Sequence, residues 1–115
     1  MSKKNRIESL IRECVSEILR RTINNQKIGF ISITGVKLSS DGSYAWVYYS
    51  QIGTEEEKRK TKYALKSAAK FIKGEFGKMV RIKIVPNMRF TYDDSLERGA
   101  HIIQKLNALA PEQND

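Results

Sequence analysis

Apolar side chains near the amino terminus recur every three or four residues: Ile7, Leu10, Ile11, Cys14, Val15, Ile18 and Leu19. That spacing places them on one side of a helix, with charged residues at the positions between them. It predicts an amphipathic helix over residues 5 to about 24, with Asn5 as the N-cap and Glu8 as the reciprocal partner of that cap. Cys14 shares the apolar side and is the only cysteine, so we expect a buried, reduced thiol.

The next two apolar segments alternate with a period of two, which is typical of strands. The first spans residues 30–39, where Gly35 breaks the alternation and predicts a β-bulge. Asp41 and Gly42 then provide the turn of a hairpin, and the second strand covers residues 44–50. One face of this strand carries Tyr44, Trp46 and Tyr48, and the other carries Ala45, Val47 and Tyr49. The alternation leaves open which face is buried, although core packing is the favoured interpretation of Trp46.

A capping box from Thr54 to Glu57 opens a long second helix that extends to about Lys78. Its apolar residues recur at helical spacing and are Leu65, Ala68, Ala69, Ile72, Phe76 and Met79. Its lysines also recur at steps of three and four, which predicts one positive, solvent-facing stripe of Lys58, Lys62, Lys66, Lys70 and Lys73. Small residues at mid-length predict a break in this helix, and Gly77 is the expected stop.

The carboxy-terminal third predicts one strand and one short helix. Val80, Ile82 and Ile84 alternate with basic residues; Pro86 interrupts this strand, and Met88, Phe90 and Tyr92 resume it. Asp94 and Glu97 form a third cap, which predicts a short helix to about Asn107, and residues 111–115 are expected to be disordered. The order helix, strand, strand, kinked helix, strand predicts an α+β fold with two layers, in a single domain over residues 1–110.

Charge then narrows the choice of partner. The 115 residues include 21 Lys and Arg against 13 Asp and Glu, a formal net charge of +8. Clustered cations gain free energy by displacing the counterions of a phosphate backbone, so nucleic acid is the first choice and an anionic membrane surface the second. No apolar run approaches the roughly 20 residues that span a bilayer. We therefore expect a cytoplasmic protein that does not bind membranes.

Catalytic and metal-binding patterns are absent from the sequence. His101 is the only histidine, and it reads as a surface residue. Asp93, Asp94 and Glu97 form a carboxylate cluster, but capping explains Asp94 and Glu97. No glycine-rich phosphate loop occurs. The sequence thus predicts no enzyme, no metal and no cofactor.

The stretch VPNMRFTYDDSLERG resembles the signature of the ribosome-binding factor A family, through Pro86, Met88, Phe90, Asp93 and Ser95. The upstream SAAKFIKGEFGKMVRIKI, the amino-terminal RIESLI and the Asp-Gly hairpin are also similar to that family, so the resemblance covers roughly residues 6–106. It implies a KH-like domain of the second type, in which two helices meet at a kink that is commonly Ala-x-Gly. Here Lys70 stands in place of that glycine, so we expect a shallower kink and an added phosphate contact.

The resemblance also implies a function: a non-enzymatic, monomeric bacterial assembly factor that binds the immature small (30S) ribosomal subunit and its 16S rRNA. It further implies support of late maturation, including processing of the rRNA 5′ end, chiefly in the cold. The expected phosphate ligands are Lys62, Lys66, Lys70, Lys73, Lys78, Arg81 and Lys83, with Arg89 as a weaker candidate and Lys3, Lys4 and Arg6 assisting. Two alternatives stay open: a general basic nucleic-acid-binding module, and a protein-binding adaptor that uses Tyr44, Trp46 and Tyr48 or the carboxy-terminal helix.

Overall fold

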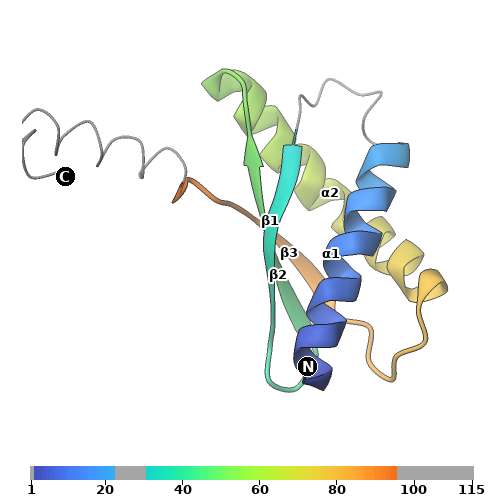
Figure 1. The fold of residues 1–115 in the computed structure, drawn as a ribbon. Coiled ribbons are helices and arrows are strands. Elements are labelled where there is room, and N and C mark those ends of the chain that lie inside the picture. Colours follow the sequence, from blue (N-terminus) through green and yellow to red (C-terminus); the bar gives the residue numbers. More distant parts are fainter. Residues whose placement is uncertain (1, 23–30, 96–115) are drawn as a thin grey trace, which may run out of the picture.

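Two helices cover one face of a three-stranded sheet in the computed structural model, which describes residues 2–22 and 31–95 (Figure 1). The elements are α1 (Lys3–Thr22), β1 (Ile31–Leu38), β2 (Tyr44–Gln51), α2 (Glu55–Met79) and β3 (Asn87–Tyr92). β2 is the central strand; it runs antiparallel to β1 and parallel to β3. The predicted α+β class with two layers is confirmed.

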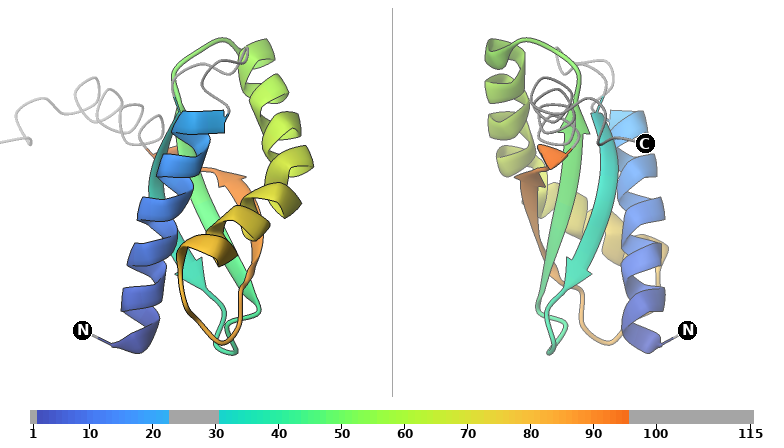
Figure 2. Two further views of the ribbon diagram at one scale, coloured as in Figure 1. Left: turned by 90° about the vertical axis from the view of Figure 1, so that its right-hand side faces the viewer. Right: turned by 60° about the vertical axis from the view of Figure 1, so that its left-hand side comes forward.

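The core lies between the helices and one face of the sheet. β2 contributes Ala45, Val47 and Tyr49 to it, and all three are buried. The helices contribute Ile11, Val15 and Ile18 from α1 and Leu65, Ile72 and Phe76 from α2. Both helices lie on the same side of the sheet (Figure 2). Because Ala45, Val47 and Tyr49 face the helices, the alternation of the strand leaves Tyr44, Trp46 and Tyr48 on the opposite face. The prediction that Trp46 packs in the core is therefore wrong.

α1 begins at Lys3, two residues before the predicted start, and ends at Thr22. Its cap is Ser2, whose Oγ accepts a hydrogen bond of 3.1 Å from the backbone N–H of Asn5. The predicted Asn5–Glu8 cap is wrong because Asn5 lies inside the helix. Glu8 instead accepts a 2.8 Å hydrogen bond from the backbone N–H of Leu38 in the edge strand β1. A tertiary contact thus replaces the expected local one.

The structure confirms the hairpin that the sequence predicts between β1 and β2. The pairing of β1 with β2 shifts between Ile33, opposite Tyr49, and Gly35, opposite Tyr48, so the predicted bulge is confirmed. Gly42 in the turn has φ of 79°, a value that side chains with a Cβ atom rarely adopt. The strand begins at Ile31 in the structure, and Phe30 lies outside the described residues.

α2 starts with the predicted capping box. The backbone N–H of Glu57 donates to Thr54 Oγ1 at 3.1 Å, and the N–H of Thr54 donates to Glu57 Oε1 at 2.7 Å. The helix then continues without interruption to Met79, so the predicted break appears only as a bend of its axis in the second half (Figure 2). Gly77 is not the stop: it lies within the helix, and a Cβ atom at this position would meet Val85 at ordinary van der Waals distance. Met79 is 43% exposed and does not belong to the core.

The last strand is shorter than predicted. β3 begins only at Asn87, and residues 80–86 form an irregular connection from the end of α2. Pro86 is buried, and because proline has no N–H to donate to a strand ladder, regular pairing starts after it. The alternation of Val80, Ile82 and Ile84 is therefore not a strand, and Ile84 is 50% exposed. The predicted carboxy-terminal helix, with Glu97 and His101, and the predicted tail lie outside the described residues.

Candidate nucleic-acid interface

The helix α2 carries an exposed line of amines, here called the lysine row: Lys62, Lys66, Lys70 and Lys73. The first three side chains are exposed at successive steps of four residues, which places them one turn apart on the same side. Lys58 leaves this line. Its Nζ lies 5.4 Å from the ring centroid of Tyr92 and 3.5 Å from Glu55 Oε2, so it faces the sheet. The predicted stripe is thus correct from Lys62 onward.

A shallow groove runs beside the lysine row, between α2 and the start of β3, and its lining includes Lys66, Lys70, Lys73 and Asn87. The Nζ of Lys73 donates a 3.0 Å hydrogen bond to Asn87 Oδ1, so these two lining residues are joined across the groove from α2 to β3. A phosphate backbone lying in the groove meets several amines that share one sign of charge. The sequence did not predict the part played by Asn87, because only the fold brings β3 beside α2.

Two aromatic residues on α2 also lie outside the core. Tyr63 is 75% exposed and Phe71 is 52% exposed. Tyr63 precedes Lys66 by three residues and Lys70 by seven, so it lies next to the lysine row on the helix surface. The sequence contained a signal for both residues, since neither occupies an apolar position of the helical repeat. Lys78 is exposed as well and lies 3.2 Å from Glu75 Oε2, a surface pair of the kind that contributes little stability.

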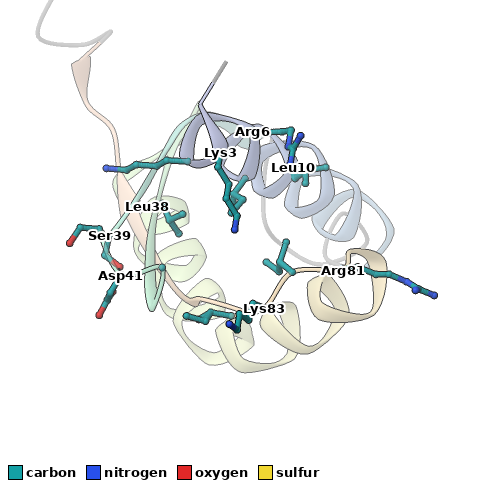
Figure 3. A pocket seen from close by; sticks show the side chains of 14 residues that line it. Lys3, Arg6, Leu10, Leu38, Ser39, Asp41, Arg81 and Lys83 are labelled. Atoms are coloured by element: carbon teal, nitrogen blue, oxygen red, sulfur yellow. Dashed lines mark hydrogen bonds between the residues drawn. The ribbon is translucent and has the colours of Figure 1, made fainter.

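Arg81 and Lys83 belong to a different place, here called the basic hollow. It is a cavity of about 530 Å³ lined by Lys3, Lys4, Arg6, Ile7, Leu10, Leu38, Ser39, Ser40, Asp41, Gly42, Arg81, Ile82, Lys83 and Ile84. Three segments meet there: the start of α1, the β1–β2 hairpin and the connection before β3 (Figure 3). The Lys3 side chain points into the hollow, whereas those of Arg6 and Arg81 point away from it. The structure therefore brings the predicted ligands Arg81 and Lys83 together with the residues expected to assist them, which are Lys3, Lys4 and Arg6.

One carboxylate, Asp41, lies among the residues that line the hollow. Its Oδ1 accepts hydrogen bonds from the backbone N–H of Ser43 at 3.0 Å, from Ser43 Oγ at 2.7 Å and from Ser39 Oγ at 2.9 Å. These bonds lower the pKa of Asp41 to about 2, so the group is ionised at neutral pH. The carboxylate of Asp41 is thus hydrogen-bonded within the hairpin turn. The other charged residues that line the hollow are all Lys or Arg.

Arg89 lies apart from both basic regions. It is in β3, and its guanidinium carbon is 4.8 Å from the ring centroid of Tyr44 on the face of the sheet opposite α1 and α2. The predicted phosphate ligands consequently fall into separate groups: the lysine row with nearby Lys78, the basic hollow, and Arg89 on the sheet.

The structure also bears on thiol chemistry, metal binding and membrane insertion. Cys14 is partly buried, and burial raises the pKa of its thiol, which disfavours the nucleophilic thiolate. Within residues 2–22 and 31–95, no three His, Cys, Asp or Glu side chains gather as a metal site requires. Over the same ranges, neither helix has the length and apolar character needed to cross a bilayer.

Comparisons with known proteins give a consistent result. The family model described as "Ribosome-binding factor A" matches residues 3–106. A protein of that name from Dictyoglomus thermophilum is 47% identical over 111 residues, which cover 96% of this chain and 92% of the relative.

Two structural matches agree with the family model. The crystal structure of ribosome-binding factor A from Thermus thermophilus matches with a TM-score of 0.69 at 22% identity, covering 79% of this chain and 97% of that one. A homology model of the Thermus thermophilus factor, fitted into a cryo-EM map of a 30S–RbfA complex, matches with a TM-score of 0.66 at 21% identity, covering 77% and 93%. These likenesses show the fold, which is KH-like. Together with the match of the family model over most of the chain, they show that this protein belongs to the ribosome-binding factor A family.

Proposed function

We propose that this protein binds the small ribosomal subunit through phosphates of its rRNA and acts as a non-enzymatic assembly factor. The observation that carries the proposal is the lysine row, a line of exposed amines on a 25-residue helix whose opposite side is anchored in the core. A rigid helix that presents charge of one sign suits recognition of a folded RNA by its backbone and shape. A related protein from Thermus thermophilus, as fitted into a 30S complex, supports the choice of partner.

The finer part of the proposal follows from family membership. We infer that the chain forms a single KH-like RNA-binding domain over residues 1–110 and acts as a monomer in the cytoplasm. It supports late maturation of the subunit, including processing of the 5′ end of 16S rRNA, most of all at low temperature. The phosphate ligands are the lysine row and Lys78, with Arg81 and Lys83 contributing from the basic hollow.

The experiment compares binding to purified small subunits over a salt series for the wild type and for the variant Lys62→Gln/Lys66→Gln/Lys70→Gln. Lys73 is left unchanged because its hydrogen bond to Asn87 gives it a structural part. We expect the affinity to fall by at least about tenfold at moderate salt, and the slope of log K against log salt to become shallower by about 2 to 3. Both changes follow from the loss of counterion release at the missing phosphate contacts.

The matched control is Arg12→Gln/Arg20→Gln/Arg21→Gln on the exposed side of α1, which removes the same amount of charge from another surface. This control should bind nearly as well as the wild type. Equal losses in the two variants would mean that net charge alone drives binding, and would contradict the assignment to the lysine row. An unrelated structured RNA of similar length serves as competitor. If it binds as tightly as the subunit at every salt concentration, the protein is a general nucleic-acid-binding module.

A further inference from the structure

The face of the sheet opposite α1 and α2 carries a row of aromatic side chains and two cations. Along the central strand β2, Tyr44, Trp46 and Tyr48 point to the side opposite the core, and Tyr44 is 37% exposed. Trp46 and Tyr48 are partly exposed. Both helices lie on the other side of the sheet (Figures 1 and 2), so neither α1 nor α2 packs over these rings. Among the described residues, three aromatic side chains thus stand in line on the face of the sheet opposite α1 and α2.

The strand pairing places cations on both sides of the central ring. Lys37 of β1 is directly opposite Trp46, and Arg89 of β3 is its partner on the other side. Arg89 also lies over the ring of Tyr44, in the position of a cation–π contact. No Asp or Glu occurs in any of the three strands. Around Tyr44 and Trp46 the face therefore combines aromatic rings with positive charge, which favours a polyanion that has flat apolar groups. A carboxylate lies beyond Tyr48: Asp93, directly after β3, accepts a 2.6 Å hydrogen bond from Thr34 Oγ1.

The spacing of the rings selects among such polyanions. Alternate residues of a strand are about 6.8 Å apart, about twice the rise of ~3.4 Å per nucleotide in a stacked duplex. Successive rings therefore suit the bases of an extended single strand, whereas the bases of a duplex are enclosed within the helix and cannot reach the rings. Tyr48 has Gly35 opposite it, and the space where a Cβ atom of Gly35 would project is open.

The row of rings ends beside the groove of the lysine row. Tyr44 pairs with Asn87 across the sheet, and the Asn87 side chain accepts the hydrogen bond of Lys73. The two surfaces thus meet at the edge strand β3. An RNA strand that leaves a folded region held at α2 has a direct way onto the sheet.

We propose that Tyr44, Trp46 and Tyr48, with Lys37 and Arg89, form a binding site for unpaired RNA. Bases stack on Trp46 and Tyr48, and the phosphates between them lie against Lys37 and Arg89. This site is distinct from the lysine row and does not depend on the ribosomal partner, because any unstructured single strand presents the same chemistry.

The test uses Trp46 as its own reporter, since it is the only tryptophan in the chain. The full-length protein is titrated with a ten-nucleotide oligouridylate and, separately, with an RNA duplex at equal phosphate concentration. We expect saturable quenching of Trp46 fluorescence by the single strand and little quenching by the duplex. Tyr48→Ala should weaken single-strand binding by about tenfold, in line with the loss of one stacked base. Tyr48→Phe keeps the ring and should bind like the wild type.

A third variant separates this site from the proposed function. Lys62→Gln/Lys66→Gln/Lys70→Gln should retain quenching by the oligouridylate even where its binding to the small subunit is lost. If that variant loses the quenching, the sheet has no binding of its own and the proposal fails. It also fails if acrylamide cannot reach Trp46 in the free protein, because the face is then covered, or if a labelled oligouridylate binds without changing Trp46 fluorescence.

Discussion

The lysine row and the basic hollow have similar charge but are built in different ways. The row comes from one helix, and its geometry follows from residues spaced four apart on a single element. The hollow takes its cations from the start of α1 and from the connection before β3, more than seventy positions apart in the sequence. The row therefore persists wherever α2 is helical, whereas the hollow exists only when α1, the hairpin and the connection are docked together. Substitutions that remove charge and substitutions that weaken the docking of α1 should therefore distinguish the lysine row from the basic hollow.

The largest effect is expected from neutralising the hollow. Lys3→Gln/Arg81→Gln/Lys83→Gln should lower the affinity for small subunits and make the salt slope shallower by about 2 to 3. Combined with the three substitutions in the lysine row, the losses in log K should add, because the two sites share no residue. Binding measured over a salt series provides the check. A combined variant that binds no worse than the row variant alone would show that the hollow makes no contact with the subunit.

A medium effect is expected from loosening the docking of α1. Glu8→Ala removes the acceptor of the Leu38 N–H and leaves that donor without its partner from α1. The free energy of unfolding should fall by about 1 to 2 kcal/mol, as measured in urea. The exposed Glu13→Ala on the same helix is the control and should change the stability little. If the two variants lose the same stability, the contact between α1 and β1 does not hold the hollow together.

The smallest effect concerns pH and the hairpin beside the hollow. The pKa of Asp41 is about 2 in the folded state, below its ordinary value of 3.8, because three donors favour its charged form. Its contribution to stability is therefore present above about pH 4 and is lost as the pH falls through about 2. Asp41→Asn should melt below the wild type at pH 6, and the difference should shrink toward pH 2. Thermal melts across that range test this, and a difference that is constant with pH would contradict it.

The sequence predicted the structure correctly where residues within a single helix or turn determine it. The capping box at Thr54 depends on residues within one turn, and the hairpin at Gly42 depends on a single backbone conformation; both are confirmed. The lysine row from Lys62 onward is confirmed for the same reason. Arg81 and Lys83 are exposed, but the strand that was expected to carry them as its basic face does not form.

The errors arose where a tertiary contact competed with a local signal. Glu8 fits the spacing of a capping box, yet its carboxylate bonds to Leu38 of the edge strand. Gly77 fits a helix stop, yet the helix continues past it to Met79 and Val85 lies beside this turn. Val80, Ile82 and Ile84 fit a strand, yet regular pairing begins only after Pro86.

The sequence by itself determined the periodic features: an amphipathic first helix, a hairpin with a bulge, and a capped helix with lysines along one side. These follow from residues close together in the chain, where spacing and backbone preference act directly. Only the tertiary structure decided which face of β2 is buried, because alternation defines two faces but not the side on which the helices pack. That choice leaves Trp46 on the face opposite α1 and α2, between Lys37 and Arg89, and the docking of α1 brings Lys3 and Lys83 to the same hollow.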